Sequence, residues 1–83
     1  MGLSRRHANL DIDTAMLACD KAVESENIAH NYACVMIACE HSIAKNALRY
    51  WKPIAGLAFG ERFREDLKGT CSTAGIVLQR SKH

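Results

Sequence analysis

The feature that most constrains the fold is a run from residue 3 to residue 52 that contains neither glycine nor proline. Glycine and proline are the residues that most often interrupt helices. The run is also rich in alanine, leucine, methionine, lysine and glutamate, which favour helix. We therefore predict an all-α protein. Because 83 residues leave room for one core, residues 1–83 are expected to form a single small helical domain.

Apolar residues recur every seven positions along this run in two adjacent rows. On a helix these rows form one stripe about 100° wide, the width expected of a core-facing side. A chain this short has difficulty covering a continuous stripe by itself, so we expect a homodimer. The residues predicted to form the dimer or core stripe are Ala15, Met16, Val23, Met36, Ile37 and Trp51.

Two arrangements fit residues 13–51. One is a single helix, which would be roughly 58 Å long. The other is a helical hairpin that turns at Ser25, Glu26 and Asn27. Serine and asparagine compete for backbone hydrogen bonds, and Glu26 interrupts the apolar stripe. Asn27 suits either a left-handed helix C-cap or a helix N-cap. We favour the hairpin and keep the long helix as the alternative.

A third helix is predicted to begin at Pro53, because proline favours the first helical position. Gly56 and Gly60 weaken its first turns, so a start only at Glu61 is the alternative. The same proline would end the preceding helix near Trp51. Gly69 then reads as the C-terminal cap of this third helix. The segments 10–13 and 75–78 have strand-like patterns, so a small terminal β-ribbon is an alternative to a docked tail.

The four cysteines are expected to be free thiols of a cytoplasmic protein. Asp11 and Asp13 fall where the apolar part of a signal peptide would have to lie. The longest apolar stretch is too short to span a bilayer, so no membrane association is predicted. In the hairpin, Cys19 and Cys34 are equidistant from the turn and should lie at the same level, able to cross-link under oxidation.

His30 and Cys34 are one helical turn apart, a spacing that can place two ligands on one metal ion or pair a thiol with a base. The sequence lacks a paired Cys-x-x-Cys motif that would supply the remaining ligands. It also shows no third group to orient a Cys–His nucleophile. We therefore predict no metal, no cofactor and no enzymatic activity, and keep a metal-binding or thiol protein using these residues as an alternative.

Charge divides the chain into two unlike parts. Residues 1–28 hold three bases and five acids, whereas residues 29–83 hold eight bases and four acids, so the second part carries a net charge of +4. Basic residues beside aromatic ones can hold phosphates and stack on bases. The residues predicted to contact a protein partner or a nucleic acid are Lys45, Arg49, Lys52, Arg62 and Arg64.

Without a catalytic constellation, binding is the expected function. We predict a small regulatory or inhibitory protein that acts by protein–protein binding, as a homodimer, and that occludes a protein or nucleoprotein complex. Stand-alone helical proteins of phages and mobile elements, such as CRISPR inhibitors and antitoxins, represent this class of action. The main alternative is a small nucleic-acid-binding protein that uses its basic face.

Overall fold

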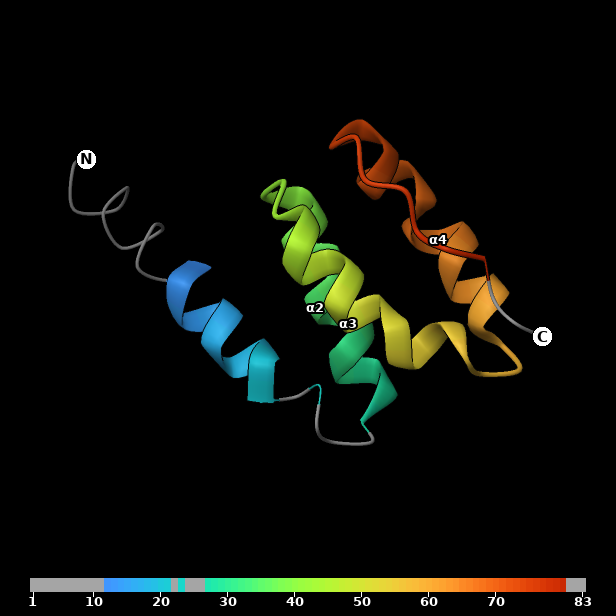
Figure 1. The fold of residues 1–83 in the computed structure, drawn as a ribbon, viewed down its shortest axis with the longest axis horizontal. Helices are drawn as coiled ribbons and strands as arrows, with labels where there is room; N and C mark the ends of the chain where they lie inside the picture. The colour runs from blue at the N-terminus through green and yellow to red at the C-terminus, as the bar shows by residue number, and fades with distance from the viewer. Residues whose placement is uncertain (1–11, 22, 24–26, 81–83) are drawn as a thin grey trace.

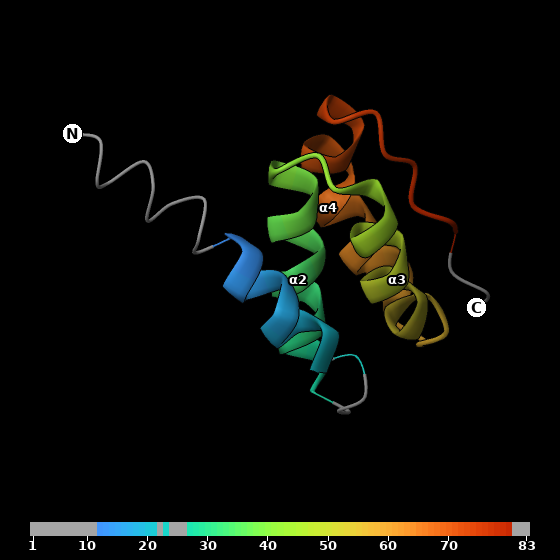
Figure 2. The ribbon, with the colours of Figure 1, turned by 60° about the vertical axis from the view of Figure 1, so that its left-hand side comes forward.

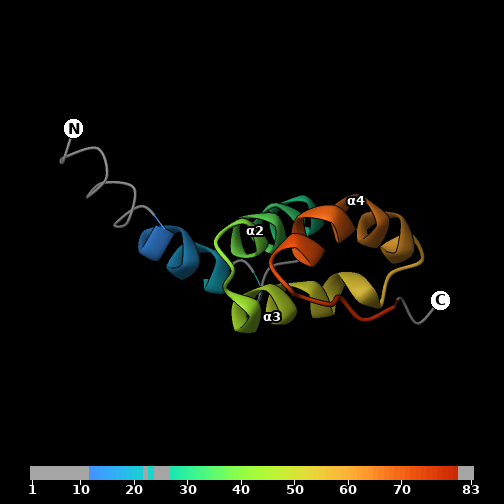
Figure 3. The ribbon, with the colours of Figure 1, turned by 90° about the horizontal axis from the view of Figure 1, so that it is seen from above.

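A computed structural model of the protein describes residues 12–21, 23 and 27–80. These residues form four helices and a C-terminal segment without regular secondary structure: helix 12–21, α2 (Ile28–Glu40), α3 (Ala44–Ala55), α4 (Gly60–Thr73) and segment 76–80. Helix α2 lies between helix 12–21 and α4 (Figures 1 and 2). Seen from above, α2 and α4 share one layer, and α3 and segment 76–80 share the other (Figure 3). The predicted all-α class is confirmed.

The hairpin break is confirmed, and a single helix over residues 13–51 is wrong. The first helix reaches residue 21 and α2 begins at Ile28; residues 24–26 lie outside the described part. Asn27 is the N-cap of α2, and its side-chain oxygen accepts a hydrogen bond from the backbone N–H of His30 at 3.1 Å. This contact satisfies one of the amide donors that a helix start leaves without a partner.

The glycine-free run has a second break, between α2 and α3, that was not expected from the sequence. Ser42 has a φ of 57°, in the left-handed region that glycine usually occupies. The N–H of Ile43 donates to the carbonyl of Ala38 at 2.8 Å, and the N–H of Ser42 donates to that of Cys39 at 3.0 Å. These two bonds form the Schellman ending of a helix, built here around a serine.

Contrary to the prediction, Pro53 does not start a helix; it lies inside the last turn of α3. A proline there removes the hydrogen bond to the carbonyl of Arg49, four residues earlier, and favours an end to the helix. The helix continues for two further residues to Ala55. After a short turn, α4 begins at Gly60, one residue before Glu61, the alternative start predicted for this helix. The predicted end near Trp51 is therefore wrong by one turn.

Gly69 does not cap the last helix, because α4 continues through it to Thr73. Gly75 ends this helix instead, with a φ of 75°. The N–H of Gly75 donates to the carbonyl of Ser72, and the N–H of Ile76 donates to that of Cys71. The glycine C-cap predicted for this helix thus exists, six residues later than expected.

Residues 10–11 of the predicted terminal ribbon lie outside the described part of the chain. Residues 12–13 are helical, and no strand occurs among the described residues. Residues 76–80 instead form a docked tail, with Ile76 and Leu78 buried. The docked tail, expected over residues 70–83, is confirmed for residues 76–80; residues 70–73 instead belong to α4, and residues 81–83 lie outside the described part.

The apolar stripe is covered within one chain. Met16 and Trp51 belong to the buried core, and Val23, Met36 and Ile37 pack against it, whereas Ala15 is partly exposed. The run folds into three helices instead of one rod, so its apolar faces turn toward one another. The reason for expecting a second copy was therefore wrong.

The expectation of free thiols is wrong, because all four cysteines are paired in disulfides. Cys19 and Cys34 lie at the same level, as the hairpin predicted, with their Cα atoms 5.7 Å apart. Cys39 and Cys71 join the end of α2 to α4, with a Cα separation of 4.8 Å. Disulfides persist in oxidising compartments, so this pairing does not favour the predicted cytoplasmic location.

Candidate binding groove

Helix α3 carries two unlike faces, and this polarity creates the candidate site. Its buried face is made by Ala47, Tyr50, Trp51, Ile54 and Ala55. These residues recur at three- and four-residue intervals, so they turn together toward α2 and α4. The opposite face is exposed and carries three cations and one leucine.

That exposed face borders a groove of about 420 Å³. The residues that line it are Lys45, Leu48, Arg49, Trp51, Lys52 and Gln79. Three cations at positions i, i+4 and i+7 of one helix thus line a single groove. Leu48, 42% exposed, lies among them and offers apolar surface that a polypeptide ligand can cover.

The C-terminal segment forms the far wall of the groove. The indole N–H of Trp51 donates to the backbone carbonyl of Gln79 at 2.8 Å. One residue earlier, the Nε of Arg64 donates to the carbonyl of Leu78 at 3.2 Å. Leu78 is buried beneath the segment, so two side chains and one apolar anchor hold this wall in place.

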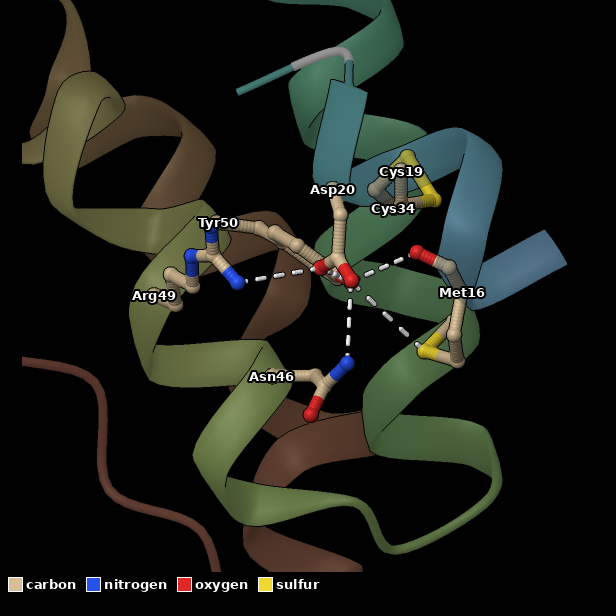
Figure 4. A network of polar contacts seen from close by, with 7 residues as sticks. All are labelled: Met16, Cys19, Asp20, Cys34, Asn46, Arg49 and Tyr50. Atoms are coloured by element: carbon tan, nitrogen blue, oxygen red, sulfur yellow. Dashed lines mark hydrogen bonds and ion pairs between the residues drawn. A yellow bond between two sulfur atoms is a disulfide. The ribbon is translucent and has the colours of Figure 1, made fainter. Parts of the chain in front are cut away.

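A network of polar contacts joins the groove to helix 12–21 (Figure 4). The Asp20 carboxylate lies 3.3 Å from Nη1 of Arg49 and accepts a hydrogen bond from the Tyr50 hydroxyl at 2.7 Å, both through Oδ1. The amide Nδ2 of Asn46 donates to the same hydroxyl at 2.9 Å. The carbonyl of Met16 lies 3.2 Å from it, a longer contact than that to Asp20.

Tyr50 is the buried centre of this network. Burial raises the pKa of Tyr50 above its ordinary value, and the hydrogen bond to the Asp20 carboxylate raises it further. The phenol therefore stays protonated at physiological pH, and its O–H donates to the Asp20 carboxylate. Asp20 is thus held by a fixed donor on one side and by a guanidinium on the other.

The structure brings together three of the five predicted contact residues. Lys45, Arg49 and Lys52 line the groove, whereas Arg62 is exposed on α4 and is not part of its lining. Arg64 is paired with Glu61 at 3.0 Å and bonded to the C-terminal segment, which gives it a structural role.

Sequence reasoning missed three residues of this site. Leu48 carried a signal, because it falls within the helical spacing of the three cations. Asp20 and Gln79 carried none, since each reaches α3 from an element distant in the sequence. Their positions depend on tertiary packing alone.

The pair His30 and Cys34 does not form a thiol or metal centre here. The Cys34 sulfur is bonded to that of Cys19, so it has no thiolate to offer an ion or a substrate. His30 is exposed on α2. Across residues 12–21, 23 and 27–80, no group of three or more histidine, cysteine or acidic side chains is arranged to hold a metal.

Two further observations bear on function. Among the described residues, no helix has both the length and the apolar character that crossing a membrane requires. No protein-family model matches the sequence, and comparison with curated proteins and with solved structures found no significant match. The groove is therefore the basis for a functional proposal.

Proposed function

We propose that this is a non-enzymatic binding protein that holds an acidic segment of a protein partner in the groove along α3. The observation that carries the proposal is that Lys45, Arg49 and Lys52 line one groove together with the exposed Leu48. Carboxylates of the partner would pair with the three cations, and an apolar side chain would cover the leucine. Binding of this kind suits a regulator or inhibitor that occludes its partner.

An acidic polypeptide fits this groove better than a nucleic acid does. Single-stranded nucleic acids are held by aromatic rings on which bases stack. Trp51 is 1% exposed and Tyr50 is fully buried, so neither offers a ring face to a base. The aromatic residues that suggested base stacking from the sequence serve the core instead.

The proposal concerns one copy of the chain and one partner. Homodimerisation, which we expected from the apolar stripe, would have to use a different surface, because the stripe is packed within the chain. Two buried disulfides favour a partner met in an oxidising compartment, or outside the cell, over one met in the cytoplasm.

The test is fluorescence anisotropy with a fluorescein-labelled peptide in which glutamates flank one leucine. We expect saturable binding that weakens as salt is added, because the contacts are exposed ion pairs. At about 0.7 kcal/mol for each exposed pair, the double variant Lys45→Ala/Lys52→Ala should lose about tenfold in affinity.

The matched control is Arg62→Ala/Lys68→Ala, which removes two positive charges outside the groove lining. This variant should bind the peptide nearly as the unaltered protein does. Equal losses in both double variants would show that net charge alone attracts the peptide, and the proposal would fail. Tighter, salt-sensitive binding of a single-stranded oligonucleotide of equal charge would favour the nucleic-acid alternative.

A further inference from the structure

The row of cations in the groove is not uniform, because its middle member already faces an anion. Arg49 lies between Lys45 and Lys52 on α3, and Nη1 of its guanidinium is 3.3 Å from the Asp20 carboxylate. The structure shows no comparable acidic side chain at either lysine among the described residues. The positive charge available to a ligand is therefore concentrated at the two ends of the row.

The Asp20 carboxylate is held more firmly than is usual for an exposed ion pair. Its Oδ1 also accepts a hydrogen bond from the buried Tyr50 hydroxyl at 2.7 Å, and Asn46 fixes that hydroxyl from the other side. The preceding residue, Cys19, is bonded to Cys34, so the backbone beside Asp20 is tied to α2 (Figure 4). Asp20 does not itself line the groove, but its carboxylate is fixed against the guanidinium of Arg49, which does.

We propose that Asp20 determines the specificity of the groove by neutralising its centre. The groove would then select a ligand with two anionic groups that reach Lys45 and Lys52, and with an uncharged side chain between them opposite Leu48. This inference rests on the proposed function and names the charge pattern that the partner must present.

The spacing of the two lysines indicates which peptides fit. They are seven residues apart on α3, which is about 10 Å along the helix axis. A peptide in the polyproline II conformation has three residues per turn and advances about 3.1 Å per residue, so two acidic residues separated by two others lie on one face, about 9 Å apart. A third carboxylate between them would face Arg49, whose positive charge is already offset by Asp20, so it would gain little attraction and would also be repelled by the Asp20 carboxylate. A nucleic-acid strand, charged at every nucleotide, meets the same penalty.

The experiment compares two fluorescein-labelled peptides of equal length in anisotropy titrations. One peptide carries two glutamates separated by two uncharged residues, one of them leucine. The other replaces the second uncharged residue with a third glutamate. The unaltered protein should bind the two-glutamate peptide at least as tightly as the other, although the second peptide has more charge.

The variant Asp20→Asn keeps a side-chain oxygen for the Tyr50 hydroxyl and removes the charge. It should bind the three-glutamate peptide about fivefold more tightly than the unaltered protein and change little toward the two-glutamate peptide. The matched control is Asp13→Asn, which removes an exposed acid from the same helix about 10 Å away along its axis. It should leave the ratio of the two affinities unchanged.

A second variant keeps the inference testable should Asp20→Asn fail to fold. Arg49→Gln leaves the Asp20 carboxylate without its cation, so it should weaken binding of the three-glutamate peptide severalfold more than that of the two-glutamate peptide. The inference is overturned if either variant shifts both affinities by the same factor. If neither peptide binds the unaltered protein, the proposed function itself fails; if both bind without the expected preference, only this inference does.

Discussion

Asn31 is buried with a side-chain amide that makes no hydrogen bond among the described residues. It lies in the first half of α2, and this holds for both its amide nitrogen and its amide oxygen. A buried polar group without a partner costs about 1–3 kcal/mol, because it has given up its bonds to water. Replacing the amide with an apolar group of similar shape should therefore stabilise the protein.

Leucine is the suitable replacement, because its side chain branches at the same atom and has the same number of heavy atoms as asparagine. Asn31→Leu removes a penalty of about 2 kcal/mol. Leucine also has a better helix propensity, by about 0.4 kcal/mol. Its extra hydrogens must fit into a packed core, which costs about 1 kcal/mol. The net gain is about 1.5 kcal/mol, or a rise in Tm of about 6–12 °C for a domain of this size.

The assay is thermal unfolding followed by circular dichroism, without reductant so that both disulfides remain intact. Asn46→Leu is the matched control, because its amide donates to the Tyr50 hydroxyl at 2.9 Å. The same substitution there gains the same helix propensity but breaks a hydrogen bond, and it should lower the free energy of unfolding by about 1 kcal/mol. A lower Tm for Asn31→Leu, with the control behaving as expected, would refute the reasoning.

Two further predictions concern the disulfides and the buried Tyr50. Replacing Cys39 and Cys71 with alanine opens a loop with a sequence separation of 32 and should lower the free energy of unfolding by about 3–4 kcal/mol in urea titrations. Detection of four free thiols in the denatured, unreduced protein would contradict the pairing. The pKa of Tyr50 is raised in the folded state, so its contribution to stability is complete below about pH 9 and is lost as the pH rises through the folded-state pKa. Tyr50→Phe should flatten that alkaline fall in the free energy of unfolding, and an unchanged slope would argue against it.

The elements that sequence predicted correctly are those with local causes. Asn27 was predicted to cap a helix at the turn, either as a C-cap or as an N-cap, and the structure makes it the N-cap of α2. Because an antiparallel hairpin places residues equidistant from its turn at the same level, Cys19 and Cys34 were expected to meet, and they do. Both inferences needed a turn position and nothing from the rest of the chain.

The errors occurred where tertiary packing overrode local preference. The break after α2 places Ser42 at a positive φ, which costs an L-residue about 1–2 kcal/mol and is therefore poorly signalled by a serine. Pro53 is tolerated within α3 because the hydrogen bond it removes lies near the helix end. The bridge from Cys39 to Cys71 depends on how α2 packs against α4, which spacing alone does not specify.

The basic residues illustrate the same limit for function. Net charge identified the second part of the chain as basic but did not separate available cations from occupied ones. Arg64 donates a hydrogen bond to the C-terminal segment and forms an ion pair with Glu61, and Arg49 forms an ion pair with Asp20. Asp20 lies in the acidic part of the sequence, 29 residues from Arg49, yet it partly neutralises the guanidinium of Arg49 in the basic part. Affinity should therefore depend on where a ligand carries its negative charges more than on how many it carries.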